Sequence, residues 1–123
     1  MKRSARRVVA GTDGRSTVEE IEIEFHHLTD VVPGAAFDAA PLGASDVALV
    51  SFEPGFVAPF HNTPAPTWMM ILAGRMGLGV SDAVWIELAP GDMIHMTDAE
   101  GEGHQSRVIG GEAVLMVTAG FGG

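Results

Sequence analysis

Short apolar runs recur along the whole chain, separated by turns rich in Gly, Pro, Asp and Ser. The pattern is clearest over residues 16–25, where Ile21, Ile23 and Phe25 alternate with Glu22 and Glu24. A period of two is typical of a half-buried strand. The same pattern predicts strands over 6–10, 16–25, 46–52, 56–61, 67–74, 76–80, 83–88, 92–97, 104–110 and 113–120. Many short strands joined by tight turns indicate an all-β sandwich or barrel.

The N-terminal third of the chain has a different pattern from the rest. Residues 30–45 are rich in Pro, Gly and Ala and predict a loop. We therefore expect residues 1–45 to form an arm, a strand pair and a loop that pack on a β-barrel of residues 46–123. With 123 residues the chain is one domain overall. An exposed sheet edge needs a partner, so the strand pair is expected to join a neighbouring copy's sheet in a homodimer.

Charge and composition narrow the classes of partner. Four of the seven basic residues lie within residues 2–7, so residues 8–123 hold three positive against sixteen negative charges. Such a body repels phosphate backbones, which argues against nucleic-acid binding. No apolar run reaches the ~20 residues of a membrane span, and no apolar stretch of signal-peptide length follows MKRSARR. We expect no membrane partner and a cytoplasmic location; the lack of cysteine excludes thiolate sites.

Two motifs stand at fixed spacings in the strand-rich region. The first comprises Gly55, His61, Thr63, Thr67 and Gly74. The second is the stretch PGDMIHMTDAEGEGHQSRV at 90–108, which contains a closing Gly-x-x-His at 101–104. Together they resemble the two motifs of the cupin superfamily over residues 46–120, in particular small single-domain cupins. The resemblance implies a cupin-type double-stranded β-helix, that is, a jelly-roll barrel.

The metal-binding positions of the resembled motifs are only partly retained. In metal cupins two His and one Glu of the first motif and one His of the second hold Fe, Mn, Ni, Cu or Zn. Here Thr63 and Thr67 stand in place of the second His and the Glu, which leaves His61 and His104. A neutral hydroxyl is a poor ligand for a divalent transition ion, and two His fall short of the usual three protein ligands. We therefore favour no cofactor; the alternative is a divalent transition metal on His61 and His104.

Three further histidines could supply a third ligand. Strand alternation favours Ile94 and Met96 on the core side, which turns His95 outward. His26 and His27 precede the barrel and reach its mouth only if the N-terminal segment folds over it.

Strand alternation also predicts which side chains line the barrel. On residues 67–72 it places Thr67, Met69 and Ile71 inside and the residues between them on the other face. On the closing strand either Leu115 with Val117, or Val114 with Met116, faces inward. An interior rich in Met and Phe suits a bulky apolar ligand. The predicted substrate-binding residues are Thr63, Thr67, Met69, Ile71, Phe52 and Ser106.

These residues predict a small cupin enzyme acting on an apolar molecule, such as a secondary-metabolite or polyketide-like intermediate. His61 and His104 would be the catalytic acid and base of an isomerisation, cyclisation or dehydration. One alternative is a metal-dependent dioxygenase or isomerase that uses the same two His as ligands. The other is a non-catalytic binding or sensing module. Asp98, a regular feature of the resembled cupins, could orient His104 or cap its loop.

Overall fold

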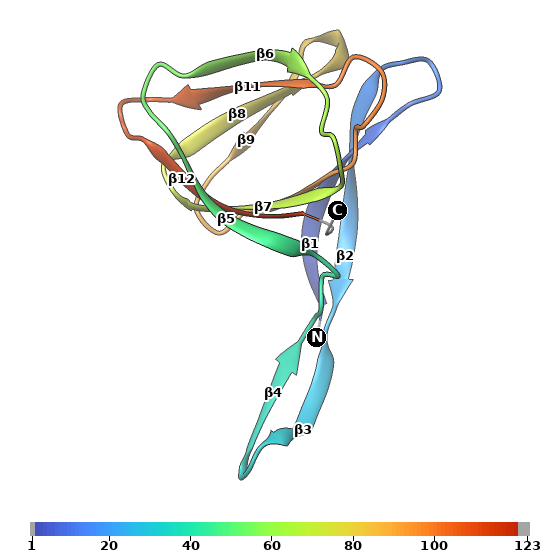
Figure 1. Cartoon of the computed structure of the whole chain (residues 1–123), viewed down its shortest axis with the longest axis vertical. Helices are drawn as coiled ribbons and strands as arrows, with labels where there is room; N and C mark the ends of the chain where they lie inside the picture. The colour runs from blue at the N-terminus through green and yellow to red at the C-terminus, as the bar shows by residue number, and fades with distance from the viewer. Residues whose placement is uncertain (1, 121–123) are drawn as a thin grey trace.

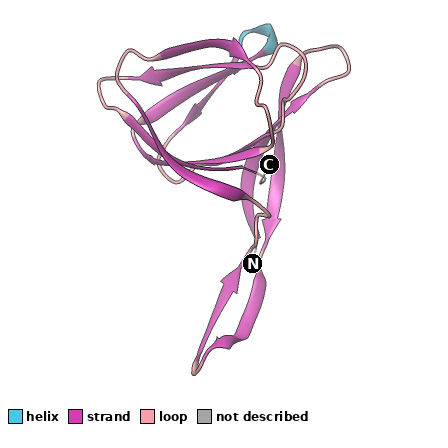
Figure 2. Cartoon of the chain, viewed as in Figure 1, coloured by secondary structure: helices cyan, strands magenta, loops and turns pink. Residues whose placement is uncertain are grey.

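The computed structural model describes residues 2–120, and these form an all-β protein with one short 3-10 turn (Figures 1 and 2). The elements are β1 (Lys2–Ala10), β2 (Ser16–Glu24), β3 (His26–Val32), β4 (Ala35–Ala39), β5 (Ser45–Phe52), β6 (Val57–His61), β7 (Thr67–Ala73), β8 (Arg75–Val80), η1 (Ser81–Ala83), β9 (Val84–Leu88), β10 (Met93–Met96), β11 (His104–Ile109) and β12 (Val114–Gly120). The strands predicted after residue 45 are confirmed, with shifts of a residue or two at their ends. Within residues 2–120 no helix has the length and apolar character needed to cross a membrane.

Two sheets face each other and enclose the core. One has six strands in the order β2-β1-β10-β7-β12-β5, and the other has four in the order β6-β11-β8-β9 (Figure 1). The predicted all-β jelly-roll class is confirmed. Across the described strands no hydrogen-bonded ladder joins the two sheets, so the barrel is open rather than closed.

The space between the sheets is filled by apolar side chains. Ile71 of β7 and Met116 of β12 are buried there, and Met69 packs against them. The predicted alternation on β7 is confirmed, since Trp68 packs in a separate cluster on the outer face and Leu72 is exposed. On β12 the inward pair is Val114 with Met116. The core cluster comprises Val8, Ile71, Met76, Leu78, Val80, Leu88, Ile94, Met96, Val114 and Met116.

The N-terminal strand pair joins the chain's own sheet. β1 pairs with β2 and, in parallel, with β10, where Arg6 lies opposite Ile94. The prediction that this pair adds to a neighbour's edge was wrong, because β10 of the same chain offers a free edge beside β7.

The prediction of a loop over residues 30–45 was wrong for much of this range, because two strands, β3 and β4, occupy residues 26–32 and 35–39. β3 and β4 form a two-stranded hairpin that projects away from the two sheets (Figure 1). Pro33 and Gly34 make its turn, and Gly34 has a φ of 76°, in the left-handed region that glycine tolerates. This hairpin, residues 26–39, is called the arm from here on; the sequence predicted an arm at the N-terminus and a loop here, and did not predict this second strand pair.

Candidate active site

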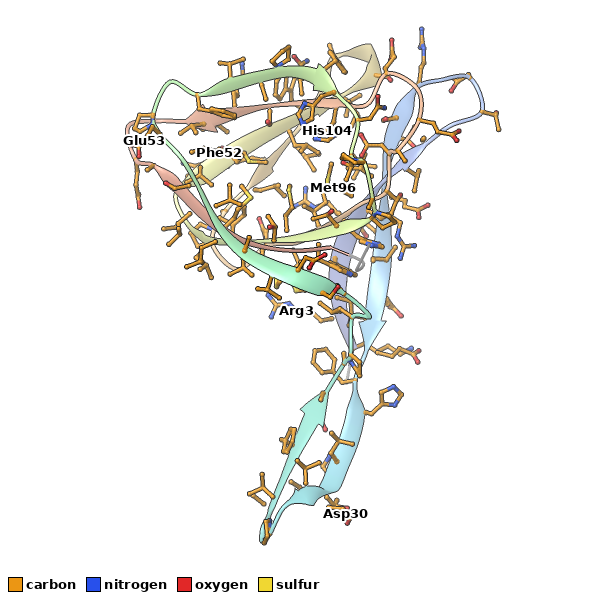
Figure 3. All side chains as sticks on the ribbon, in the orientation of Figure 1. Arg3, Asp30, Phe52, Glu53, Met96 and His104 are labelled. Atoms are coloured by element: carbon orange, nitrogen blue, oxygen red, sulfur yellow. The ribbon has the colours of Figure 1, made fainter. Side chains whose placement is uncertain are left out.

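Two histidines meet where β6 and β11 pair at the rim of the four-stranded sheet. His61, the last residue of β6, lies opposite His104, the first residue of β11. The centroids of the two rings are 4.4 Å apart and the planes are tilted by 56°. His104 is 6% exposed and lies with Met96 in the upper part of the molecule in Figure 3, whereas His61 is open to solvent. The predicted pairing of these two residues is therefore realised, with one ring buried and one accessible.

A buried carboxylate holds the ring of His104. Asp98 is completely buried, and its Oδ2 lies 2.6 Å from Nδ1 of His104. The hydroxyl of Thr63 donates to the other oxygen, Oδ1, at 2.9 Å. A carboxylate only accepts hydrogen bonds, so Nδ1 of His104 carries the proton and Nε2 is left with its lone pair. Thr63, Asp98 and His104 thus form a chain that fixes both the orientation and the tautomer of the buried ring.

Hydrogen bonds from Asn62 and Thr63 hold the loop that carries Asp98 against the end of β6. Asn62 donates through Nδ2 to the carbonyl of Gly101 at 3.0 Å, and the Thr63 N–H donates to the Asp98 carbonyl at 3.2 Å. Gly103 has a φ of 78°, and a Cβ on it would lie 2.0 Å from the His61 carbonyl oxygen. Only glycine lets the loop pass this close to β6. Asn62, Thr63 and Gly103 therefore together hold the loop in the position that brings Asp98 to His104.

His61 is oriented by its own strand. Its Nδ1 lies 2.8 Å from the carbonyl oxygen of Pro59 and donates to it. As in His104, the second ring nitrogen, Nε2, is the one left for chemistry. Two imidazoles with defined tautomers, one buried and one in contact with water, can exchange protons with a bound molecule.

The structure separates the other predicted site residues. Ser106 is buried one alternation along β11 from His104, on the same inward face. Thr67 turns its hydroxyl to the Ala65 carbonyl at 2.9 Å. Ile71 lies within the packed core, and Met69 and Phe52 pack against that core. Of the residues predicted to bind substrate, Thr63 is the one that joins the histidine pair through hydrogen bonds.

Three cavities of about 240, 330 and 430 Å³ lie away from the histidines. The middle one is lined by residues of the β1–β2 turn and of the η1 region, among them Arg15, Ser16, Ser81 and Val84. None of the three is lined by His61 or His104.

The donor set at this site does not match a catalytic metal centre. Among the described residues no group of three or more His, Asp or Glu side chains is placed to hold an ion. Asp98 directs both carboxylate oxygens to Thr63 and His104, which leaves two imidazoles. Catalytic sites usually supply three protein ligands. The residues present therefore do not fit the metal centre of the resembled motifs.

The three other histidines lie away from the pair. His26 and His27 are exposed on the arm, and Nδ1 of His27 is 2.8 Å from Oδ1 of Asp38. His95 faces outward from the core, as predicted, but it is only 7% exposed. Its ring stacks on Trp68 at 4.4 Å and accepts a hydrogen bond from Nε of Arg7 at 3.1 Å. Burial lowers the pKa of His95, and the nearby positive charge of Arg7 lowers it further.

From the sequence, Asp98 was predicted to orient His104 or to cap its loop, but it was not among the predicted site residues. The signal in the sequence is its place between the two histidines, in a loop that also contains glycines at 101 and 103. Asn62 was missed altogether, because a single Asn beside a His has no distinctive pattern.

Comparisons with known proteins bear on the fold. No protein-family model matches the sequence, and no curated protein matches it. Among solved structures the chain is similar to a cupin-like protein from Thermotoga maritima, at 16% identity and a TM-score of 0.53, over 80% of this chain and 68% of that one. It is also similar to the DMSP lyase DddQ from Ruegeria pomeroyi, at 21% identity and a TM-score of 0.54, over 80% of this chain and 47% of the lyase. A Cupin 2 conserved barrel domain protein from Salinispora arenicola matches at 18% identity and a TM-score of 0.51, over 79% and 73% of the two chains.

These similarities show that the chain has the fold of small single-domain cupins. The chain spans about half the length of the lyase. At such identities the likeness concerns the fold alone, since one fold carries many chemistries.

Proposed function

We propose that this protein is an enzyme that moves protons on a small apolar molecule and so catalyses an isomerisation, cyclisation or dehydration. The observation that supports this most is the 2.6 Å bond between buried Asp98 and Nδ1 of His104. A carboxylate behind an imidazole is the usual arrangement for a histidine that works as a general base.

His104 is the base in this proposal. Its Nε2 takes a proton from a carbon or hydroxyl of the substrate, and the ring becomes an imidazolium. The negative charge of Asp98 stabilises that imidazolium across the short Nδ1 contact. The Thr63 hydroxyl holds the carboxylate in place from the other side. The completely buried position of Asp98 strengthens this electrostatic contribution, because water screens it little.

His61 is the acid. In its protonated form it donates from Nε2 to the substrate oxygen that gains charge or leaves as water. Its ring is 4.4 Å from that of His104, so both can reach neighbouring atoms of one small molecule. A proton removed at carbon by His104 and a proton delivered at oxygen by His61 together balance an enolisation or a dehydration. Because His61 is exposed, solvent can restore the protonation state of the pair.

The aromatic and methionine side chains that border the core between the two sheets support an apolar substrate. Phe52 and Phe56 stack at 4.2 Å with nearly parallel rings, and Phe52 and Met69 border the core. Aromatic rings and methionine bind apolar groups of varied shape.

The test uses probe substrates, since proton transfer at carbon can be followed on simple molecules. Purified protein is incubated with a panel of apolar β,γ-unsaturated ketones, and conjugation is followed by ultraviolet absorbance. We expect turnover that falls by roughly 10²–10⁴ in His104→Ala and His61→Ala, which is the usual contribution of a general acid or base. His26→Ala, on the exposed arm, is the matched control and keeps full activity. Full turnover in both site variants, or no turnover by the natural chain on any probe, contradicts the proposal.

A second function, non-catalytic binding or sensing, is favoured by one observation: the space between the sheets is filled by a packed apolar core. A ligand would then sit at the rim, near His61. Calorimetry with the same ketones distinguishes the two functions, because a sensor binds a probe and returns it unchanged.

A further inference from the structure

A cavity of about 330 Å³ lies at the corner between the β1–β2 turn and η1, and neither site histidine lines it. Figure 2 shows η1, in cyan, at the same end of the molecule as this turn. The apolar lining residues are Val18, Val80 and Val84, which belong to β2, β8 and β9. Most of the polar lining residues lie within residues 13–17. Apolar walls with a few polar groups are the usual composition of a small-molecule site.

One polar side chain of this cavity, the hydroxyl of Ser16, lacks a hydrogen-bond partner. Ser16 is 1% exposed, and in the part of the chain that the structure describes no group bonds to its Oγ. Its backbone N–H, in contrast, donates to Oγ of Ser81 at 3.0 Å. A buried hydroxyl that stays unpaired lowers stability, and a ligand oxygen that accepts from it removes that cost. The cavity should therefore favour ligands that carry an acceptor oxygen.

The described residues that line the cavity carry no net charge. Asp13 and Arg15 contribute one charge of each sign, and the other lining residues are neutral. A charged ligand would give up its hydration beside Val18 and Val80 without an uncompensated charge to pair with. The lining therefore favours an uncharged molecule.

The volume of the cavity sets the size of that molecule. An apolar cavity of about 150 Å³ is large enough to hold benzene. This cavity has about 330 Å³, so it has room for roughly twice as many non-hydrogen atoms. A fused pair of six-membered rings is of this size.

We propose that this cavity is a ligand site separate from the histidine pair, and that it binds a neutral, mainly apolar molecule with one carbonyl group. The carbonyl oxygen accepts a hydrogen bond from the Ser16 hydroxyl. The apolar part of the molecule packs on Val18, Val80 and Val84. Occupancy of the cavity also steadies the loop that carries Asp98.

Hydrogen bonds connect the walls of the cavity to that loop. Ser81, a lining residue, donates from Oγ to Oε2 of Glu102 at 2.7 Å, and the Glu102 N–H donates to the Gly14 carbonyl at 2.7 Å. Gly101 lies so close to the same carbonyl that an added Cβ would be 2.4 Å from its oxygen. A molecule bound between the β1–β2 turn and η1 therefore contacts both of the segments that Glu102 joins. Its binding should reduce local opening of the loop.

Calorimetry of the full chain with 1-tetralone, a neutral bicyclic ketone, tests the site, and tetralin, the same ring system without oxygen, is the matched probe. We expect saturable binding of one tetralone per chain. In Ser16→Ala the ratio of the dissociation constant of tetralin to that of tetralone should fall about five-fold, which corresponds to one hydrogen bond. Urea unfolding should show no loss of stability in this variant, because the Ser16 hydroxyl has no hydrogen bond to lose.

A second pair of variants locates the bound molecule. Val84→Asn removes part of the apolar wall and should weaken tetralone binding about five-fold. Val57→Asn makes the same change at a residue that is 66% exposed on β6 and does not line the cavity, so it should leave binding unchanged.

Amide hydrogen exchange measures the effect on the loop. With saturating tetralone, exchange of the Glu102 N–H should slow by a larger factor than exchange of the Val108 N–H. The Val108 N–H is the control, because it donates to the Phe56 carbonyl at 3.1 Å, away from the cavity.

Each part of the proposal can fail separately. If tetralone does not bind saturably, or if Val84→Asn leaves its binding unchanged, the cavity is not the site. An unchanged ratio of dissociation constants in Ser16→Ala removes Ser16 from the site and indicates that water satisfies its hydroxyl. Equal slowing of exchange at Glu102 and Val108 shows that occupancy does not act on the loop.

Discussion

Replacing Asp98 with Asn tests the site without any knowledge of the substrate. The substitution keeps the size and shape of a fully buried side chain and removes its charge. The new amide can accept from Thr63 through its oxygen but presents an N–H group to Nδ1 of His104. Nδ1 must then accept, and the proton moves to Nε2. The ring therefore changes to the tautomer that has no lone pair facing the substrate.

The loss of stability follows from the two hydrogen bonds that Asp98 accepts. A hydrogen bond to a charged group contributes about 1.5–3 kcal/mol and a neutral one about 0.5–1.5 kcal/mol. Weakening both bonds should lower the free energy of unfolding by about 2–3 kcal/mol. This is a large fraction of the ~5–15 kcal/mol that stabilises a domain.

Nitrogen-15 NMR of histidine-labelled protein measures the tautomer, and urea unfolding measures the stability. We expect a protonated Nδ1 on His104 in the natural chain and a protonated Nε2 in Asp98→Asn. Glu100→Gln, an exposed substitution in the same loop, is the control and should change neither quantity. An unprotonated Nδ1 in the natural chain, or an unchanged tautomer in the variant, would refute the role given to Asp98.

Further predictions concern the loop, the outer histidine and metal content. Gly103→Ala should destabilise the fold by more than the ~1–3 kcal/mol of a left-handed alanine, since its Cβ would strike the His61 carbonyl. Gly110→Ala, with a similar φ of 80° and no atom within 4 Å of the added Cβ, should show only that cost in urea unfolding. Burial and the positive charge of Arg7 lower the pKa of His95 in the folded protein. The stability that the neutral His95 ring contributes should therefore be complete above the unfolded-state pKa of about 6.5 and be lost as the pH falls through the folded-state pKa. His95→Gln should flatten the decline in unfolding free energy between pH 8 and 5; an equally steep decline would assign it to other groups. Elemental analysis of protein purified without chelator should find well under one transition ion per chain, and one ion bound per chain by the two site histidines would contradict this.

The strands after residue 45 could be predicted because each is a short, largely apolar run that turn residues such as Gly, Pro, Asp or Asn separate from the next. The alternation on β7 was enough to assign Met69 and Ile71 to the core side and Trp68 to the other. The pairing of His61 with His104 followed from the spacing of two motifs that are typical of one fold. The local sequence pattern was therefore enough to predict the strands after residue 45 and the pairing of the two histidines.

The arm and the parallel pairing of β1 could not be predicted in this way. Ala35, Ala36 and Ala39 have low strand propensity, so their strand depends on its pairing with β3. The contact of Arg6 with Ile94 joins distant parts of the chain, and nothing in either segment specifies the other. The role of Asp98 depends on how a loop closes over β6, which alternation does not describe.

The parallel pairing of β1 with β10 has a consequence for folding kinetics. About two thirds of the chain separates the two strands, and the side-chain contact between Arg7 and His95 spans 88 residues. Folding slows as contacting residues lie further apart in sequence, so refolding should take milliseconds to seconds. The Glu102 N–H also donates to the Gly14 carbonyl at 2.7 Å, which ties the loop of Asp98 to the β1–β2 turn. During synthesis the first strand must therefore wait for the last third of the chain to leave the ribosome before the histidine site can be completed.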